Sequence, residues 1–120
     1  MPVMNFSLIT RDGKIVLAPS YDYLSTTVAF LSIGKRPDQI EELALPLQGK
    51  KRGLTRNTWV EYFAKERLSL PDKIVGKVLT DIRSAVPLWK TCLAESFLPP
   101  EHQTLYARLL DQRLAVLGIG

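Results

Sequence analysis

Two oxygen-bearing side chains near the N-terminus, Asn5 and Asp22, have the types and spacing to bind a metal ion together. A β-hairpin between them would bring them to the same place. Mg²⁺ takes oxygen ligands and is usually held by a few protein groups together with water and phosphate oxygens. The pair therefore indicates a candidate Mg²⁺ site. Asn and Asp near strand ends also commonly cap turns or bond to nearby backbone, and that alternative stays open.

The hairpin is predicted over residues 5–20. Asp12-Gly13 lies between two apolar runs, which is typical of a type I′ turn because both central residues need a positive φ. With these two residues as the loop, the register gives the pairs Arg11 with Lys14, Leu8 with Leu17, Phe6 with Pro19 and Asn5 with Ser20.

Strand alternation sorts the hairpin side chains into two faces. One face carries four apolar residues that we expect to belong to the core: Phe6, Leu8, Ile15 and Leu17. Asn5 lies on the other face, opposite Ser20. Asp22 has the same parity as Ser20 and should project to the same side. Diagonal neighbours on one face lie about 7–8 Å apart, which is within reach of one cation.

The middle of the chain gives weaker signals. Residues 20–25 are predicted to form a loop or a single turn, and residues 34–38 a surface loop. Leu43, Leu45 and Leu47 alternate like a short strand, which Pro46 would confine to a sheet edge.

Three helices are predicted from residue 55 onward. Thr55 is a plausible N-cap for the first, which runs to about Arg67. Its expected inward residues are Trp59, Val60 and Phe63. The second begins at Pro71, and Pro87 should kink or split it. Its expected inward stripe is Ile74, Val78, Ile82, Val86, Trp89 and Leu93. The third begins at Pro99-Pro100-Glu101 and ends at Gly118. Its expected apolar face is Leu105, Leu109, Leu110, Leu114 and Leu117.

The predicted fold class is α+β and mainly helical: an N-terminal β-hairpin and a short strand are followed by a lobe of three to four helices. Residues 1–120 are expected to form a single domain. No apolar run approaches the ~20 residues that span a bilayer, and no secretory signal is recognisable. Cys92 is the only cysteine, so an intrachain disulfide is excluded and a cytoplasmic location is expected.

Several stretches together resemble the HipA-like serine/threonine kinases, the toxins of toxin–antitoxin systems. They are residues 5–9 (Asn-Phe-Ser-Leu-Ile), residues 17–25 (Leu-Ala-Pro-Ser-Tyr-Asp-Tyr-Leu-Ser), and residues 43–56 around Leu-Pro-Leu-Gln-Gly-Lys and Arg-Gly-Leu-Thr-Arg. The resemblance covers most of the chain and implies the C-terminal, helical kinase lobe. It implies that Asn5 is a Mg²⁺ ligand and that Asp22 plays the part of the metal-binding aspartate of kinases. Mg²⁺ and ATP are the cofactors of the intact family.

The chain also departs from that family. The catalytic Asp of the family lies five residues before its Asn, which falls one position before Met1. Pro2 and Met4 stand where the family has His and Lys. The phosphate-binding loop, the ATP-pairing lysine and the N-terminal lobe are missing. Phosphoryl transfer depends on positioning and charge neutralisation. We therefore expect a truncated member with no catalytic residue of its own, inactive and without bound cofactor when alone; whether it is an enzyme in any setting stays open.

A basic stretch follows the proposed edge strand. Lys50, Lys51, Arg52 and Arg56 could contact phosphate or nucleic acid, consistent with a net charge of +4. A solvated turn is the alternative. The two remaining reactive side chains are interpreted structurally: His102 as a surface residue and Cys92 as a small packing residue.

Three functions compete on these grounds. The first is a kinase remnant, whose missing lobe a partner chain would supply. The second is a protein–protein interaction module that forms a homo-oligomer or binds a partner such as an antitoxin. The third is a weak DNA-binding module that uses residues 50–56, although any nucleic-acid contact is expected to be indirect. No membrane partner is expected.

Overall fold

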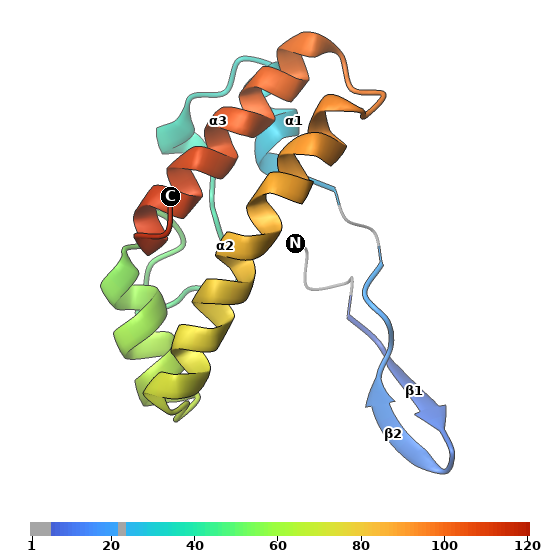
Figure 1. The fold of residues 1–120 in the computed structure, drawn as a ribbon, viewed down its shortest axis with the longest axis vertical. Coiled ribbons are helices and arrows are strands. Elements are labelled where there is room, and N and C mark those ends of the chain that lie inside the picture. The colour runs from blue at the N-terminus through green and yellow to red at the C-terminus, as the bar shows by residue number, and fades with distance from the viewer. Residues whose placement is uncertain (1–5, 22–23) are drawn as a thin grey trace.

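The computed structural model describes residues 6–21 and 24–120 (Figure 1). A two-stranded antiparallel hairpin comes first and helices follow, so the fold is α+β and mainly helical, as predicted. The elements in chain order are β1 (Leu8–Arg11), β2 (Lys14–Leu17), α1 (Thr26–Ser32), η2 (Pro37–Gln39), η3 (Thr58–Arg67), α2 (Asp72–Ala94) and α3 (Pro100–Leu117).

The hairpin register is the one that the turn predicted. Leu8 pairs with Leu17, and Arg11 pairs with Lys14 across the turn. Asp12 and Gly13 have φ of 52° and 74°, so both central residues adopt the left-handed conformation that a type I′ turn requires. The ladder continues one step past the strands, because the Ala18 N–H donates to the Ser7 carbonyl at 2.9 Å.

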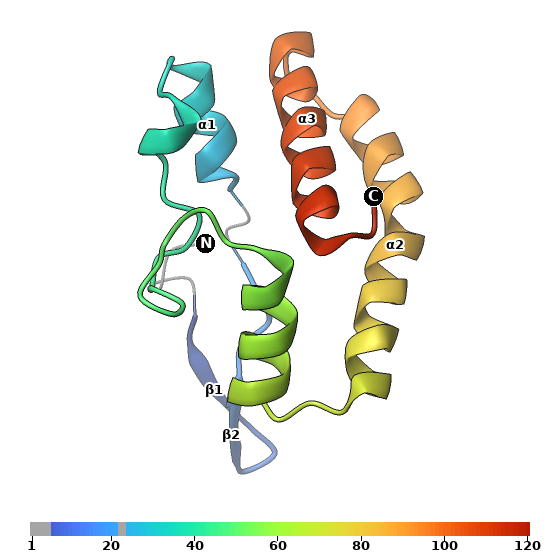
Figure 2. The same ribbon diagram turned by 90° about the vertical axis from the view of Figure 1, so that its left-hand side faces the viewer.

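The expectation that the apolar hairpin face belongs to the core is wrong. Phe6, Leu8, Ile15 and Leu17 are between 58% and 74% exposed. Figures 1 and 2 show the reason: the hairpin extends away from the helices, so no helix covers this face. Correct strand alternation makes a face apolar, but burial also needs a second layer placed against it.

Helix α1 was not predicted, although its signals are local. The Ser25 hydroxyl accepts a hydrogen bond from the Val28 N–H at 3.3 Å, which caps the first turn. Val28 is buried, and α1 packs against α3. Gly34 follows the last turn with φ of 83°. A serine cap and a terminating glycine frame this helix, whereas the β-branched residues Thr26 and Thr27 obscure it.

The short strand expected over residues 43–47 is reduced to one bridge between Leu47 and Lys50. Gln48 and Gly49 both have positive φ, 49° and 70°, and turn the chain back on itself immediately. Within the described residues only the hairpin forms a sheet, so residues 43–47 have no strand beside which they could lie.

The helix predicted from Thr55 is present as η3, which the two α-helical residues 56–57 precede. The Thr55 hydroxyl accepts from the Thr58 N–H at 3.3 Å, so Thr55 caps it as predicted. The helix is wound in the wide π form, as the bond from the Leu68 N–H to the Phe63 carbonyl illustrates. Ser69 then turns the chain toward α2 with φ of 52°.

Helix α2 runs unbroken through Pro87, so of the two predicted outcomes, a kink or a split, the split is wrong. Pro87 is exposed, and water can reach the carbonyl that its missing N–H leaves unpaired. The predicted inward stripe is confirmed in part, because Ile82, Val86 and Leu93 are half-buried. Val75 is buried, while Ile74, Val78 and Trp89 are 43–48% exposed. Only one side of α2 meets η3 and α3, and the rest of its apolar surface is open.

Helix α3 lies at the centre of the helical lobe and packs against both α1 and α2 (Figure 2). It ends as predicted at Gly118, whose φ is 69°. Leu114 is buried, and the other four residues of its predicted apolar face are half-buried. The most buried apolar residues are Val28, Ile40, Leu54, Val60, Val75, Leu114 and Ile119.

Candidate functional site

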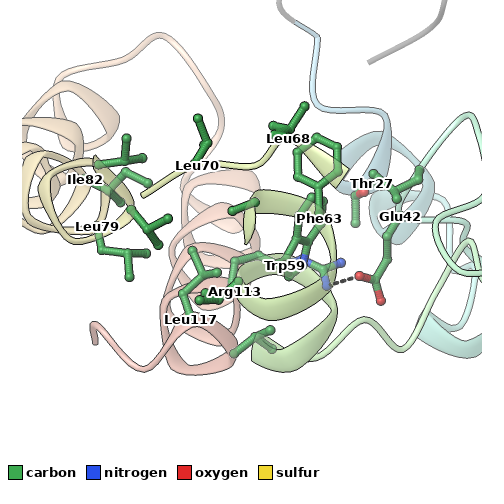
Figure 3. A pocket seen from close by; sticks show the side chains of 16 residues that line it. Thr27, Glu42, Trp59, Phe63, Leu68, Leu70, Leu79, Ile82, Arg113 and Leu117 are labelled. Atoms are coloured by element: carbon green, nitrogen blue, oxygen red, sulfur yellow. Dashed lines mark ion pairs between the residues drawn. The ribbon is translucent and has the colours of Figure 1, made fainter. Parts of the chain in front are cut away.

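An open apolar groove lies where η3, α2 and α3 meet, with a volume of about 570 Å³ (Figure 3). Of its lining residues only Glu42 and Arg113 are charged. The groove is lined by Thr27, Glu42, Leu43, Trp59, Val60, Phe63, Ala64, Leu68, Leu70, Val75, Val78, Leu79, Ile82, Arg113, Val116 and Leu117. We call this set the apolar groove.

One wall of the apolar groove is aromatic. Trp59 and Phe63 lie one turn apart on η3, and their rings meet edge to face with centroids 6.1 Å apart. Such pairs are favourable beyond the area they bury. Phe63 is still 36% exposed, and Leu68 beside it is 51% exposed. The aromatic wall is therefore formed but not covered.

Helix α2 supplies the opposite wall, and an ion pair of Lys65 links η3 to α2. The Lys65 ammonium lies 3.0 Å from the Asp72 carboxylate in the first turn of α2 and 3.2 Å from Glu61 on its own helix. These bonds, the one to Asp72 first, raise the pKa of Lys65 above its usual value of 10.5. The bridge links η3 to the first turn of α2 through exposed side chains.

An ion pair lines the apolar groove. The Arg113 guanidinium on α3 lies 2.7 Å from the Glu42 carboxylate, and the Gly53 N–H donates to that carboxylate at 2.9 Å (Figure 3). The Glu42 side chain is only 18% exposed. Because the two charges neutralise each other, the groove has no unpaired charge among its lining residues.

The basic residues predicted to meet phosphate are largely engaged within the chain. Lys51 lies 3.1 Å from the Glu41 carboxylate. Arg52 donates to the Asp38 carbonyl, and Arg56 donates to the Leu117 carbonyl at the end of α3. A phosphate would have to compete with these oxygens for Lys51, Arg52 and Arg56.

Their positions separate the four basic residues into two groups. Lys50, Lys51 and Arg52 line a shallow hollow with Gln39, Glu41 and Gly49. Arg56 lies instead against the C-terminal turn of α3, where a cation complements the free carbonyls. The structure therefore brings three of the four predicted residues together and places Arg56 in a helix cap.

The predicted Mg²⁺ ligands Asn5 and Asp22 lie outside the described residues. Among residues 6–21 and 24–120, no group of three or more His, Cys, Asp or Glu side chains is arranged to hold a metal ion. No helix in the same part of the chain is long and apolar enough to cross a membrane. The metal site stays a prediction from the sequence.

Comparison with known proteins adds no family. No protein-family model and no curated protein matches this chain. The resemblance to HipA-like kinases therefore rests on the sequence stretches at residues 5–9, 17–25 and 43–56.

Two interpretations of single residues change with the structure. Cys92 is exposed rather than packed, and it lines a second hollow between α2 and α3 with Trp89, Leu93, Tyr106 and Leu110. His102 lies in the first turn of α3, as expected, but is half-buried. Neither residue has a neighbouring acid or base within the described hydrogen bonds that would activate it.

The sequence did not point to the apolar groove as a site. Leu68 and Leu70 lie in the connection between η3 and α2, where apolar residues carry no periodicity to interpret. Glu42 and Arg113 are far apart in sequence, and no local motif joins them. A search for large apolar residues in connecting segments would have found Leu68 and Leu70 as residues without an assigned partner.

Proposed function

We propose that this chain is a partner-binding helical lobe of the HipA-like kind, which acts by associating with another polypeptide rather than by catalysing a reaction alone. The observation that carries the proposal is the amount of surface left open. The chain has an accessible surface of 9044 Å², whereas a compact monomer of 13.5 kDa exposes roughly 6,500 Å².

Part of the open surface is apolar. Large apolar side chains are exposed on the hairpin, at Phe63 of η3 and at four positions of α2, namely Ile74, Val78, Leu88 and Trp89. The radius of gyration is 16.2 Å, against roughly 13.5 Å for a compact domain of this length. Large exposed apolar surface is typical of protein-interaction sites.

The residues available for chemistry support a binding role over catalysis. Phosphoryl transfer needs a base, metal ligands and a cradle for the phosphates. Asn5 and Asp22 are the only metal ligands that the resemblance carries to this chain, and three of its four candidate phosphate contacts already have oxygen partners. Catalysis would require a base and a phosphate cradle in addition to these groups.

Site-specific photo-crosslinking in cells tests the binding role. A benzophenone amino acid is placed at Ile15 on the hairpin or, as a matched control, at Ile33 at the end of α1; both isoleucines are 74% exposed. We expect a discrete protein adduct from position 15 and little from position 33. Equal or absent adducts at the two positions would contradict the proposal.

A phosphoryl-transfer assay tests the catalytic half of the proposal. The purified chain is incubated with Mg²⁺ and γ-labelled ATP, and we expect no labelled chain because the base and phosphate cradle are missing from its sequence. Autophosphorylation that Asn5→Ala and Asp22→Ala abolish would overturn it, since it would make the chain an enzyme by itself.

A further inference from the structure

Neither face of the hairpin is covered by another element of the described residues. Each strand is four residues long, and every residue of both strands is exposed. An isolated two-stranded hairpin is at best marginally stable in water; it needs a third strand or a packing surface. The face formed by Phe6, Leu8, Ile15 and Leu17, which we call the arm face, therefore lacks the layer that would stabilise it.

The apolar groove is likewise not covered by another element of the described residues. It is concave and apolar, and several of its side chains remain open, including Leu68 at 51% and Val78 at 48% exposed. Its two charged residues already pair with each other at 2.7 Å. An apolar occupant would leave no charge buried without a partner.

The arm face matches the groove in chemistry. With Thr10, it presents only apolar and hydroxyl side chains, because the register puts Arg11 and Lys14 on the opposite face of the hairpin. The hairpin that carries the arm face projects beyond the helices (Figure 1), while the groove is hollowed between them (Figure 3). One chain therefore carries both halves of a possible contact.

We propose that the arm face of one copy docks in the apolar groove of a second copy, and reciprocally, to form a two-fold symmetric dimer. In such an interface the arm of each copy lies in the groove of the other, so the same contact is made twice. The assembly is therefore complete with two chains, and no arm face or groove stays uncovered. This inference deepens the proposed partner-binding function and rests on it, by naming the partner as this same chain.

The chain as a whole has more open surface than an interface of standard size covers. The chain exposes roughly 2,500 Å² more than a compact monomer of its mass. A stable interface of standard size buries only about 800 Å² on each partner. Covering the arm face and the apolar groove together would use part of this excess.

Light scattering with size-exclusion chromatography tests the dimer. At about 100 μM we expect the wild-type chain at twice the 13.5 kDa monomer mass. Ile15→Asp puts a charge into the contact and should raise the dissociation Kd at least about tenfold. Ile33→Asp, which changes an equally exposed isoleucine outside both surfaces, should leave the dimer intact.

Cysteine pairing tests which surfaces meet. In a Cys92→Ser background, one chain carries Leu17→Cys and a second, differently tagged chain carries Val78→Cys. Because each chain has a single cysteine, any disulfide between the two tags is intermolecular. We expect mixed disulfide between positions 17 and 78, and little when Ile33→Cys replaces Val78→Cys as the partner.

The outcomes separate this inference from the proposed function. A wild-type monomer at 100 μM, a dimer that Ile15→Asp leaves unchanged, or no mixed disulfide between positions 17 and 78 would each overturn the arm-in-groove dimer. If the photo-adduct from position 15 then contains a different protein, the partner-binding function stands and only the identity of the partner is wrong. If position 15 yields no adduct, both the dimer and the proposed partner-binding function are wrong. Val78→Asp repeats the test from the groove side, should Ile15→Asp alter the hairpin itself.

Discussion

At the scale of single residues, Glu42 joins separate parts of the chain through several polar contacts. Its carboxylate accepts from the Arg113 guanidinium and from the Gly53 N–H, and its own N–H donates to the Lys51 carbonyl at 2.7 Å. These bonds join the 41–53 loop to α3. Glu41 beside it pairs with Lys51 at 3.1 Å, but in a position that is 59% exposed. Adjacent glutamates thus differ in burial rather than in chemistry.

That difference predicts unequal losses of stability. Glu42→Gln keeps an acceptor for Gly53 but removes the charge opposite Arg113, and should lower the free energy of unfolding by about 1–2 kcal/mol. Glu41→Gln should cost no more than about 0.5 kcal/mol, as is usual for exposed ion pairs. Urea unfolding followed by circular dichroism measures both. Similar losses for the two variants would contradict the role assigned to Glu42.

Lys65 provides a pH-dependent test. Its pKa is raised in the folded chain by its bonds to Asp72 and then Glu61, so the folded state holds the proton more tightly than the unfolded state. The bridge therefore stabilises the fold below the ordinary lysine pKa of 10.5, and this contribution is lost as pH rises through the higher, folded value. We expect the wild-type Tm to fall more steeply above pH 10.5 than the Tm of Lys65→Met.

Thermal scans across this pH range need a control because other groups also titrate there. Lys14→Met, at the exposed hairpin tip, removes a lysine that is remote from the bridge and should keep the wild-type slope. A Lys65→Met slope equal to that of wild type would contradict the contribution of the bridge.

At the scale of elements, the helices are specified locally to different degrees. α3 has a proline start and a left-handed glycine end, and η3 has a threonine cap; both were predicted within a few residues. α2 was predicted in position, but its inward stripe only in part, since Ile82, Val86 and Leu93 are half-buried while Ile74, Val78 and Trp89 are exposed. A local cap determines where a helix begins, whereas its orientation depends on what packs against it.

The cap on η3 gives a test at this scale. Thr55→Ala removes the acceptor for the Thr58 N–H and should lower the free energy of unfolding by about 1 kcal/mol. Thr91→Ala changes an exposed threonine within α2, whose hydroxyl only bonds back to the Pro87 carbonyl, and should be neutral or slightly stabilising. Chemical denaturation of the two variants makes the comparison; an equal loss from Thr91→Ala would contradict the capping role.

At the scale of the whole molecule, the hairpin and the helical lobe behave as two unequal parts. The lobe has a modest core, with no side chain below 2% exposed among the described residues, and the hairpin contributes nothing to it. A chain with so much apolar surface open should gain stability from any partner that covers it. The dimer proposed above makes that gain depend on concentration.

Thermal unfolding at several concentrations tests this dependence. For a dimer, the wild-type Tm should rise steadily between about 5 and 200 μM, because association favours the folded state by mass action. Ile15→Asp should have a Tm that is independent of concentration, whereas Ile33→Asp should follow the wild type. A wild-type Tm that is constant over this range would contradict a dimer linked to folding.

The sequence by itself determined those features of the fold that depend on residues close to one another in the chain. The Asp12-Gly13 turn requires positive φ and so specified the hairpin register, and Thr55 and Gly118 marked helix ends through hydrogen bonds that span a few residues. Ser25 marks the start of α1 in the same way, through the hydrogen bond from the Val28 N–H to its hydroxyl.

Only the tertiary structure decided which apolar surfaces are covered. Phe6, Leu8, Ile15 and Leu17 share a face by strand alternation, yet they are exposed because no element of residues 6–21 and 24–120 lies opposite them. The apolar groove joins three helices and the Glu42–Arg113 pair, which no short pattern connects. Periodicity says which side of an element is apolar; burial depends on contacts between distant segments, and those exist only once the chain is folded.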